Sequence, residues 1–218
     1  MKRLVDYSLY LCTDRELMTS KTLEECVERA ILGGVTCVQL REKQASSLEF
    51  YEEAKRVLQI TKTYGVPLII NDRVDIALAI DADGVHLGKN DMSIAEARAI
   101  LGSGYIIGST VNSFEDVLCT LQSATPDYFG CGPFRETATK RNLSPRLGVD
   151  GYRDIIHKMR GSGIDIPVVA IGGIRKEDIP LLLECGISGI ALSGSILNAQ
   201  DPVAETQEVL TALKTTTY

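Results

Sequence analysis

Short apolar runs alternate with longer amphipathic stretches along the whole chain. Each run is four or five residues long and carries few charges, a pattern typical of parallel strands that are buried on both faces. The runs predict eight strands, at residues 9–13, 36–40, 67–71, 84–87, 105–109, 128–132, 167–171 and 189–193.

The stretches between these runs predict helices, several of which have recognisable ends. Thr22 is a suitable N-cap with Glu25 as its capping-box partner, and this helix is expected to end at Gly34. Ser47 opens a second helix, and Asp201 caps the last one. The remaining helical patterns lie at residues 74–80, 94–101, 113–123, 152–160, 177–185 and 202–213.

Strands that alternate with helices form a parallel sheet, and eight repeats favour closure into a barrel over an open doubly wound sheet. A chain of 218 residues is long enough for one α/β (β/α)8 TIM barrel, so we expect a single barrel domain over residues 1–218. Loops as long as the connection at residues 134–149 are uncommon in compact domains, so this one is expected to be functional or mobile.

Composition narrows the classes of partner. The formal net charge of -6 disfavours non-specific nucleic-acid binding, and no apolar run approaches the length of a membrane span. The N-terminal apolar run is too short for a signal peptide. The six cysteines form no C-x-x-C pair, which indicates reduced, mostly buried thiols. We therefore expect a cytoplasmic protein with neither nucleic-acid nor membrane partners.

Two cations directly follow the second predicted strand. Arg41 and Lys43 are two residues apart, so in an extended chain their side chains project to the same side. Arginine offers a planar fork to phosphate oxygens, and lysine offers a compact charge. A phosphate site is one interpretation, and a solvated strand end neutralised by Glu42 is the other.

Two acids follow the third and fourth predicted strands. Asp72 alone is best interpreted as an N-cap for the helix that begins near Val74. Asp91 changes that balance, because adjacent strands lie about 4.8 Å apart and both carboxylates could then reach one cation. Mg²⁺ is the natural candidate, since it takes a few carboxylates and completes its shell with water and phosphate.

Glycine and hydroxyl side chains follow the later strands. The loops after the seventh and eighth strands of many barrels bind phosphate through backbone N–H groups, which suits Gly173 and the Ser193-Gly194 pair. Neither His86 nor His157 has a nucleophile partner in the sequence, which disfavours Ser-His or Cys-His catalysis. Further hydroxyls and a cation, which could equally form an ordinary polar loop, are Thr110, Thr137, Thr139 and Lys140.

Taken together, these segments resemble the thiamine phosphate synthase family over nearly the whole chain. The resemblance implies a TIM-barrel transferase that joins the pyrimidine and thiazole halves of thiamine and releases pyrophosphate, with Mg²⁺ as its cofactor. The motifs that carry it are QLREK at 39–43, INDRVDIA at 70–77, DGVHLGKND at 83–91, TATK at 137–140 and AIGGI at 170–174.

The same resemblance implies a role for each matching residue. Asp72 and Asp91 would hold Mg²⁺, and Arg41, Lys43 and Lys140 would be the catalytic cations. The pyrimidine diphosphate would be held by Gln39, Leu40, Arg41, Glu42, Lys43, Asn71, Thr110 and Lys140. The thiazole phosphate would be held by Thr137, Ala138, Thr139, Gly173, Ser193 and Gly194.

These residue types suit a reaction in which the C–O bond breaks first, to a pyrimidine methylene cation that the thiazole nitrogen attacks. Cations and a metal that neutralise the departing pyrophosphate are then sufficient, without a strong base. Two alternatives stay open: a thiazole tautomerase of the same family, and a non-catalytic ligand-sensing member. A homo-oligomer is also left open.

We predict that Lys140→Ala slows pyrophosphate release more than it weakens thiazole binding, because cationic charge is needed where the phosphates depart. Single-turnover kinetics on the pyrimidine diphosphate measure the first effect, and the Michaelis constant for thiazole phosphate measures the second. A variant altered only in thiazole affinity would assign Lys140 to the other pocket.

Overall fold

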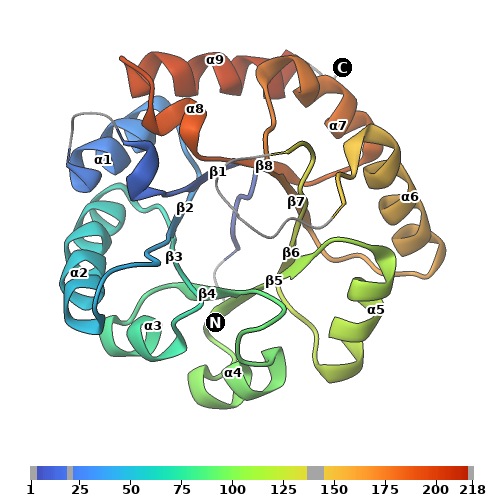
Figure 1. The fold of residues 1–218 in the computed structure, drawn as a ribbon, viewed down its shortest axis with the longest axis horizontal. Helices are drawn as coiled ribbons and strands as arrows, with labels where there is room; N and C mark the ends of the chain where they lie inside the picture. Colours follow the sequence, from blue (N-terminus) through green and yellow to red (C-terminus); the bar gives the residue numbers. More distant parts are fainter. Residues whose placement is uncertain (1–3, 19–21, 137–144, 216–218) are drawn as a thin grey trace.

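The computed structural model describes residues 4–18, 22–136 and 145–215. Within these residues the strands pair in parallel, each with the next along the chain, and the last pairs with the first to close a barrel. Figure 1 shows this barrel inside its ring of helices, which confirms the expected fold class. The strands are β1 (Leu9–Cys12), β2 (Cys37–Leu40), β3 (Leu68–Asn71), β4 (Gly84–Leu87), β5 (Ile106–Val111), β6 (Tyr128–Cys131), β7 (Val168–Ile171) and β8 (Gly189–Leu192).

Helices follow the strands around the outside of the barrel. In the part of the chain just defined, none of them combines the length and the apolar character that a membrane crossing requires. They are α1 (Leu23–Gly33), α2 (Ser47–Tyr64), α3 (Val74–Ile80), α4 (Ile94–Leu101), α5 (Phe114–Ser123), α6 (Gly148–Gly161), α7 (Ile179–Cys185), α8 (Gly194–Leu197) and α9 (Pro202–Thr215), with the 3-10 turns η1 (Arg15–Leu17) and η2 (Lys176–Asp178).

The helix ends agree with the sequence in part. Thr22 accepts a hydrogen bond from the Glu25 backbone N–H, and Asp201 accepts one from the Val203 N–H, so both predicted caps are confirmed. Ser46, rather than Ser47, caps α2, with Glu49 completing its capping box. The helix predicted at 152–160 begins earlier, at residue 148, and the short α8 was not expected.

Alternate residues of each strand enter two separate layers of the core. One face packs beneath the helices and includes Leu40, Ile70 and Phe129. The other face fills the barrel interior with side chains such as Tyr10 and Tyr128. Because adjacent residues point to opposite sides of the barrel wall, each polar residue of a strand is assigned to one layer by its position alone.

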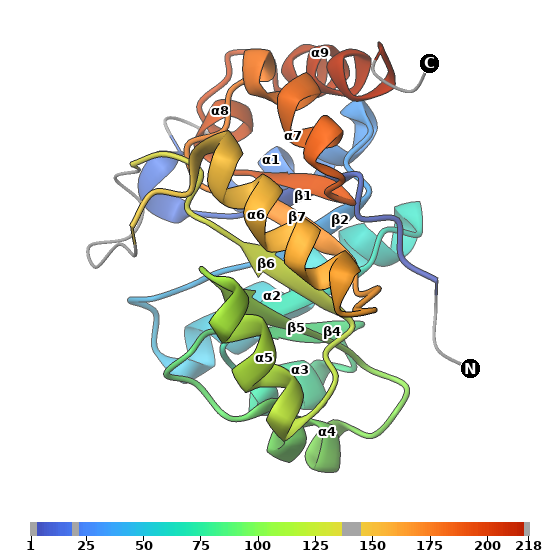
Figure 2. The same ribbon diagram turned by 90° about the vertical axis from the view of Figure 1, so that its right-hand side faces the viewer.

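The two ends of the barrel differ. Figure 2 shows the N-terminal segment at one end and the connections after β1 and β6 at the other. Tyr7, in the N-terminal segment, stacks on Tyr128 with ring centroids 4.7 Å apart, and so packs against the interior layer at its N-terminal end. The C-terminal end of the strands is therefore the end available for a site, as is usual in this architecture.

Tyr152 ties helix α6 to the barrel wall. Its hydroxyl donates to the Cys131 carbonyl at the end of β6 and accepts from the Ile171 N–H at the end of β7. The side chain is fully buried, so water cannot replace either bond. One phenol thus satisfies backbone groups of two neighbouring strands.

We predict that Tyr152→Phe lowers the free energy of unfolding by about 1–3 kcal/mol, because it leaves a buried backbone N–H without its acceptor. Urea denaturation followed by circular dichroism measures the change. Tyr105→Phe is the matched control, since its hydroxyl donates to Asp81 at the surface, and it should stay within about 0.5 kcal/mol of wild type. Equal losses in both variants would contradict the role assigned to Tyr152.

Candidate active site

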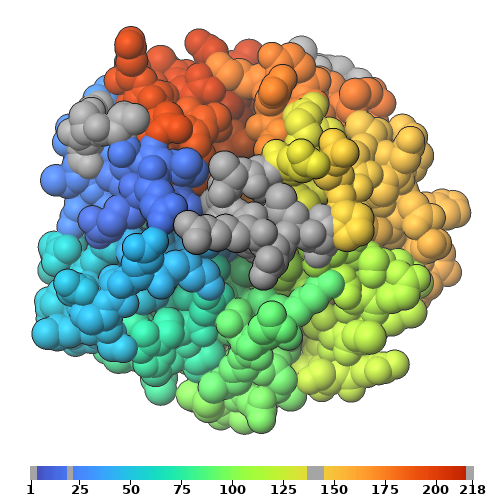
Figure 3. All heavy atoms as spheres, viewed as in Figure 1, coloured from blue at the N-terminus to red at the C-terminus, as the bar shows by residue number. Residues whose placement is uncertain are grey.

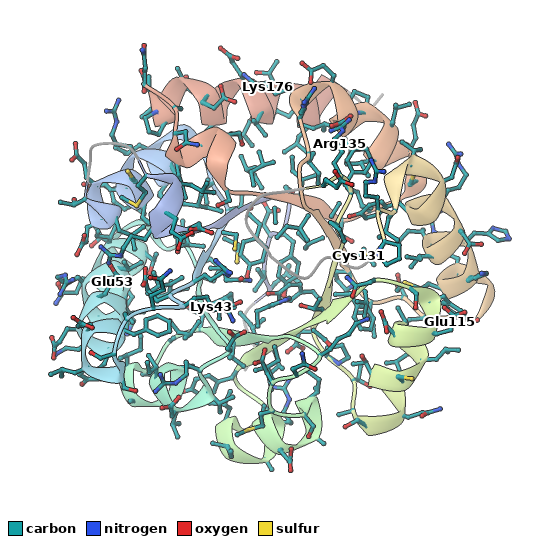
Figure 4. All side chains as sticks on the ribbon, viewed as in Figure 1. Lys43, Glu53, Glu115, Cys131, Arg135 and Lys176 are labelled. Carbon is teal, nitrogen blue, oxygen red and sulfur yellow. The ribbon has the colours of Figure 1, made fainter. Side chains whose placement is uncertain are left out.

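Polar side chains gather at the C-terminal ends of the strands. Gln39 and Asn71 are buried at interior positions of β2 and β3, and Thr110 lies near the end of β5. Figure 4 shows Lys43 toward the middle of the ring of helices, whereas the labelled Glu115 and Lys176 lie on its outer part. In Figure 3, segments from the blue, green, yellow and red parts of the chain lie around the middle of this same face. The strand ends therefore bring together residues that are far apart in sequence.

Arg41 is held in place by the end of β1. Its backbone N–H donates to the Thr13 hydroxyl (3.0 Å), and its guanidinium donates to Asp14 (3.0 Å). The Arg41 side chain is 14% exposed, so this ion pair is largely shielded from solvent. Asp14 engages one edge of the guanidinium, and the fork is therefore oriented before any anion binds.

The residues on either side of Arg41 point elsewhere. Leu40 packs in the outer layer beneath the helices, so only its backbone faces the strand ends. Glu42 accepts a hydrogen bond from Arg15 (3.1 Å), and Arg15 also pairs with the buried Glu53 of α2. Glu42 is thus engaged by a third cation, which argues against the alternative in which it neutralises Arg41 and Lys43.

Asp72 follows β3 in an unusual backbone conformation. Its φ of 63° lies in the left-handed region, which costs a residue other than glycine about 1–3 kcal/mol. Its N–H donates to the His86 carbonyl of β4 (2.9 Å). The N-cap position of α3 is occupied by Arg73 without a side-chain bond, so the interpretation of Asp72 as a helix cap is wrong. The strained turn instead directs the Asp72 carboxylate to Lys43.

Asp72 and Asp91 lie close enough to shift each other's pKa. Burial acts to raise the pKa of Asp72, but the hydrogen bonds from Lys43 and Asp91 and the charge of Lys43 outweigh it and lower that pKa. Burial and the contact with Asp72 raise the pKa of Asp91, although the Gly88 N–H also donates to this carboxylate (2.7 Å). Two carboxylates so close share a proton in the absence of a compensating charge, which is the condition that a cation would relieve.

The donor set of this pair fits a hard cation. The described residues contain no group of three or more His, Cys, Asp or Glu side chains placed to hold a metal. Two carboxylates from neighbouring strand ends leave most of a six-coordinate shell to water and phosphate oxygens, which is how Mg²⁺ is usually bound. Asp72 and Asp91 are therefore the residues that could hold it.

A second group of residues lies at the ends of β7 and β8. The Ser193 hydroxyl is buried and has no hydrogen-bond partner among the described residues. Gly173 has a φ of 67°, and a Cβ there would meet the Cβ of Arg135 at 2.8 Å. At Gly194 a Cβ would meet Leu17 at 3.4 Å and Asn198 at 3.5 Å, which is ordinary contact, so glycine is not required there by packing. The buried Ser193 hydroxyl without a described partner is the stronger indication of an anion site.

Arg135 connects the loops that follow β6 and β7, a contact that no sequence pattern predicted. Its guanidinium binds both carboxylate oxygens of Asp178 at 2.6 and 2.7 Å and donates to the Gly173 carbonyl at 2.8 Å. Gly173 is therefore a packing residue of this loop pair as well as a candidate phosphate contact. The predicted residues Thr137, Ala138, Thr139 and Lys140 lie outside the described residues.

His86 has partners that the sequence did not indicate. Its Nδ1 is 2.9 Å from the Tyr128 hydroxyl and its Nε2 is 2.9 Å from the Thr110 hydroxyl. The Tyr128 hydroxyl is 2.8 Å from that of Tyr10, which accepts a hydrogen bond from the Gln39 amide (3.1 Å). We call these five residues the interior relay. All five residues lie at inward-facing positions of their strands, and this alternation is the sequence signal from which the interior relay could have been predicted. The other histidine, His157, is exposed on α6.

Comparisons with known proteins place this chain among relatives of high sequence identity. A family model described as thiamine monophosphate synthase matches residues 9–196. The chain is 52% identical over 181 residues to a thiamine-phosphate synthase of Phocaeicola vulgatus, covering 83% of this chain and 86% of the relative. It is 44% identical over 209 residues to that of Clostridium botulinum, covering 96% and 95%.

A solved structure shows the same fold. The thiamine phosphate pyrophosphorylase from Pyrococcus furiosus superposes with a TM-score of 0.85 at 37% identity, and the match covers 98% of each chain. The family model spans well over half of the sequence, and relatives of high identity are matched over most of their length. The chain therefore belongs to the thiamine monophosphate synthase family.

Proposed function

We propose that this protein joins the diphosphate of 4-amino-5-hydroxymethyl-2-methylpyrimidine to a thiazole phosphate and releases pyrophosphate. The observation that supports it most is the contact between Lys43 and the Asp72–Asp91 pair, beside Arg41, in a chain of the thiamine monophosphate synthase family. Two acids in contact at adjacent strand ends, flanked by two cations, suit a diphosphate that binds with a metal ion.

Each of these residues has a role in breaking the C–O bond. Arg41, oriented by Asp14, would bind the diphosphate oxygens, and Lys43 would neutralise charge as it develops on the leaving group. Mg²⁺ held by Asp72 and Asp91 would supply further charge neutralisation to the departing pyrophosphate. The amino group of the pyrimidine stabilises the methylene cation, so this chain need not supply a base.

The second substrate would be held at the ends of β7 and β8. Ser193 would donate a hydrogen bond from its hydroxyl to the thiazole phosphate, and the backbone N–H of Gly194 could donate a second. Binding there aims the thiazole nitrogen at the cation, and positioning of this kind lowers the barrier to the second step.

The alternatives are separated by one assay. A thiazole tautomerase needs neither the metal pair nor a diphosphate site, and a ligand-sensing member would not turn over. Incubation of both substrates with and without Mg²⁺, followed by detection of thiamine phosphate, should give product only in the presence of the metal. Isomerised thiazole without thiamine phosphate would support the tautomerase.

We predict that Asp72→Ala and Asp91→Ala each lower turnover by at least about 100-fold, the scale of losing one preorganised electrostatic group. Steady-state kinetics over a Mg²⁺ titration measure the effect. Asp75→Ala is the matched control, because this carboxylate lies just beyond the strand end and pairs with Arg73 at the surface. Near-normal, Mg²⁺-dependent turnover in either test variant would remove the metal assignment.

We predict that Ser193→Ala raises the Michaelis constant for thiazole phosphate by about 10-fold or more, because it removes a hydrogen bond to a charged ligand. Thermal stability should hold, since the hydroxyl has no partner among the described residues. Ser195→Ala, at an exposed position of α8, is the control and should leave the Michaelis constants for both substrates unchanged. An unaltered constant for Ser193→Ala would place the phosphate elsewhere.

A further inference from the structure

The interior relay crosses the barrel inside the ring of strands. Tyr10 and Tyr128 are each 1% exposed, and Gln39 and His86 are nearly as buried. A buried polar group without a partner is costly, so these hydroxyl, amide and imidazole groups are held to one another. Only Thr110, at the end of β5, is partly accessible. The relay thus begins at one predicted substrate contact, Gln39, and ends at another.

Hydrogen-bond counting gives the relay a direction. An amide nitrogen only donates, so the Tyr10 hydroxyl accepts from Gln39 and its own proton is available to Tyr128. Tyr128 can then donate to Nδ1 of His86, which places the imidazole proton on Nε2. Nε2–H donates to the Thr110 hydroxyl, and that hydroxyl keeps its own proton to donate to a ligand.

The barrel is shaped to admit these rings. A Cβ on Gly108 would meet the Tyr128 ring at 2.2 Å, and a Cβ on Gly130 would meet the His86 ring at 2.7 Å. Two inward positions on β5 and β6 thus lack a side chain where a relay ring needs space. The relay is therefore a packed unit whose geometry is set by the surrounding strands.

We infer that His86 is a positioning residue for the pyrimidine substrate: through the interior relay it holds the Thr110 hydroxyl as a hydrogen-bond donor. This inference rests on the proposed function, in which Thr110 contacts the pyrimidine diphosphate. Gln39 faces inward on β2, two residues before Arg41, which follows the strand end, so the ring would sit below the diphosphate. The Thr110 hydroxyl, as a donor at the end of β5, matches a ring nitrogen of the aminopyrimidine, which is an acceptor.

The test compares His86→Leu with His86→Gln, whose terminal amide can still donate toward Thr110. Initial rates are measured against each substrate, and inhibition by inorganic pyrophosphate with Mg²⁺ probes the diphosphate site without the ring. We expect His86→Leu to raise the Michaelis constant for the pyrimidine diphosphate about tenfold. His86→Gln should keep that constant close to the wild-type value. The thiazole phosphate constant and pyrophosphate inhibition should not change.

A double-mutant cycle keeps the test decisive if His86→Leu folds poorly. Tyr128→Phe interrupts the relay at its centre and should reproduce the selective rise in the Michaelis constant for the pyrimidine diphosphate. Tyr7→Phe, which removes a hydroxyl from the ring packed on Tyr128 but leaves the relay intact, should not. Thr110→Val and Tyr128→Phe should be strongly non-additive, because they act through one hydroxyl.

Two results would overturn the inference in an enzyme that makes thiamine phosphate. One is an equal loss of pyrophosphate inhibition and of both substrate affinities, which would mark His86 as structural. The other is full additivity of the Thr110 and Tyr128 substitutions. If wild type forms no thiamine phosphate from the two substrates, the proposed function fails, and the inference fails with it.

Discussion

Each strand of this barrel must satisfy two environments at once, because successive side chains point to opposite sides of its wall. The outer side buries residues such as Leu40 and Ile70 beneath the helices. The burial of these apolar side chains sets the register of the strands, since a shift by one residue would move every apolar side chain to the wrong layer. Once the register is set, Gln39 and His86 face inward, and Lys43, which follows β2, contacts Asp72.

The charges at the strand ends are arranged in pairs that differ in how tightly they are held. Arg41 and Asp14 form a shielded pair that orients a guanidinium. Lys43 is about half exposed, and it contacts the Asp72 carboxylate, whose pKa is lowered by that contact. Ionic contacts at exposed groups are weak in water, so Lys43 can exchange partners at little cost when a diphosphate arrives. One cation is thus fixed and the other adaptable.

Local patterns in the sequence were sufficient for the barrel, because each apolar run is long enough to identify a buried strand. They failed where a contact depends on distant residues or on backbone strain. His86 and Tyr128 are 42 positions apart, so their hydrogen bond becomes visible only when the barrel closes. Asp72 is of a residue type that often caps helices, but its backbone is in the left-handed region and it does not cap α3. Helix α6 begins at Gly148, a residue that gives no helical signal.

The small residues inside the barrel have an evolutionary consequence. Gly108 and Tyr128 are register partners on β5 and β6, and the phenol ring fills the space that any side chain at position 108 would need. Substitutions at the two positions are therefore coupled, and their order matters: position 128 must become smaller before position 108 can become larger. The first of these steps gives up the hydroxyl between Tyr10 and His86. Lineages that keep this hydroxyl are thereby held to glycine at position 108, and the two positions should covary among relatives.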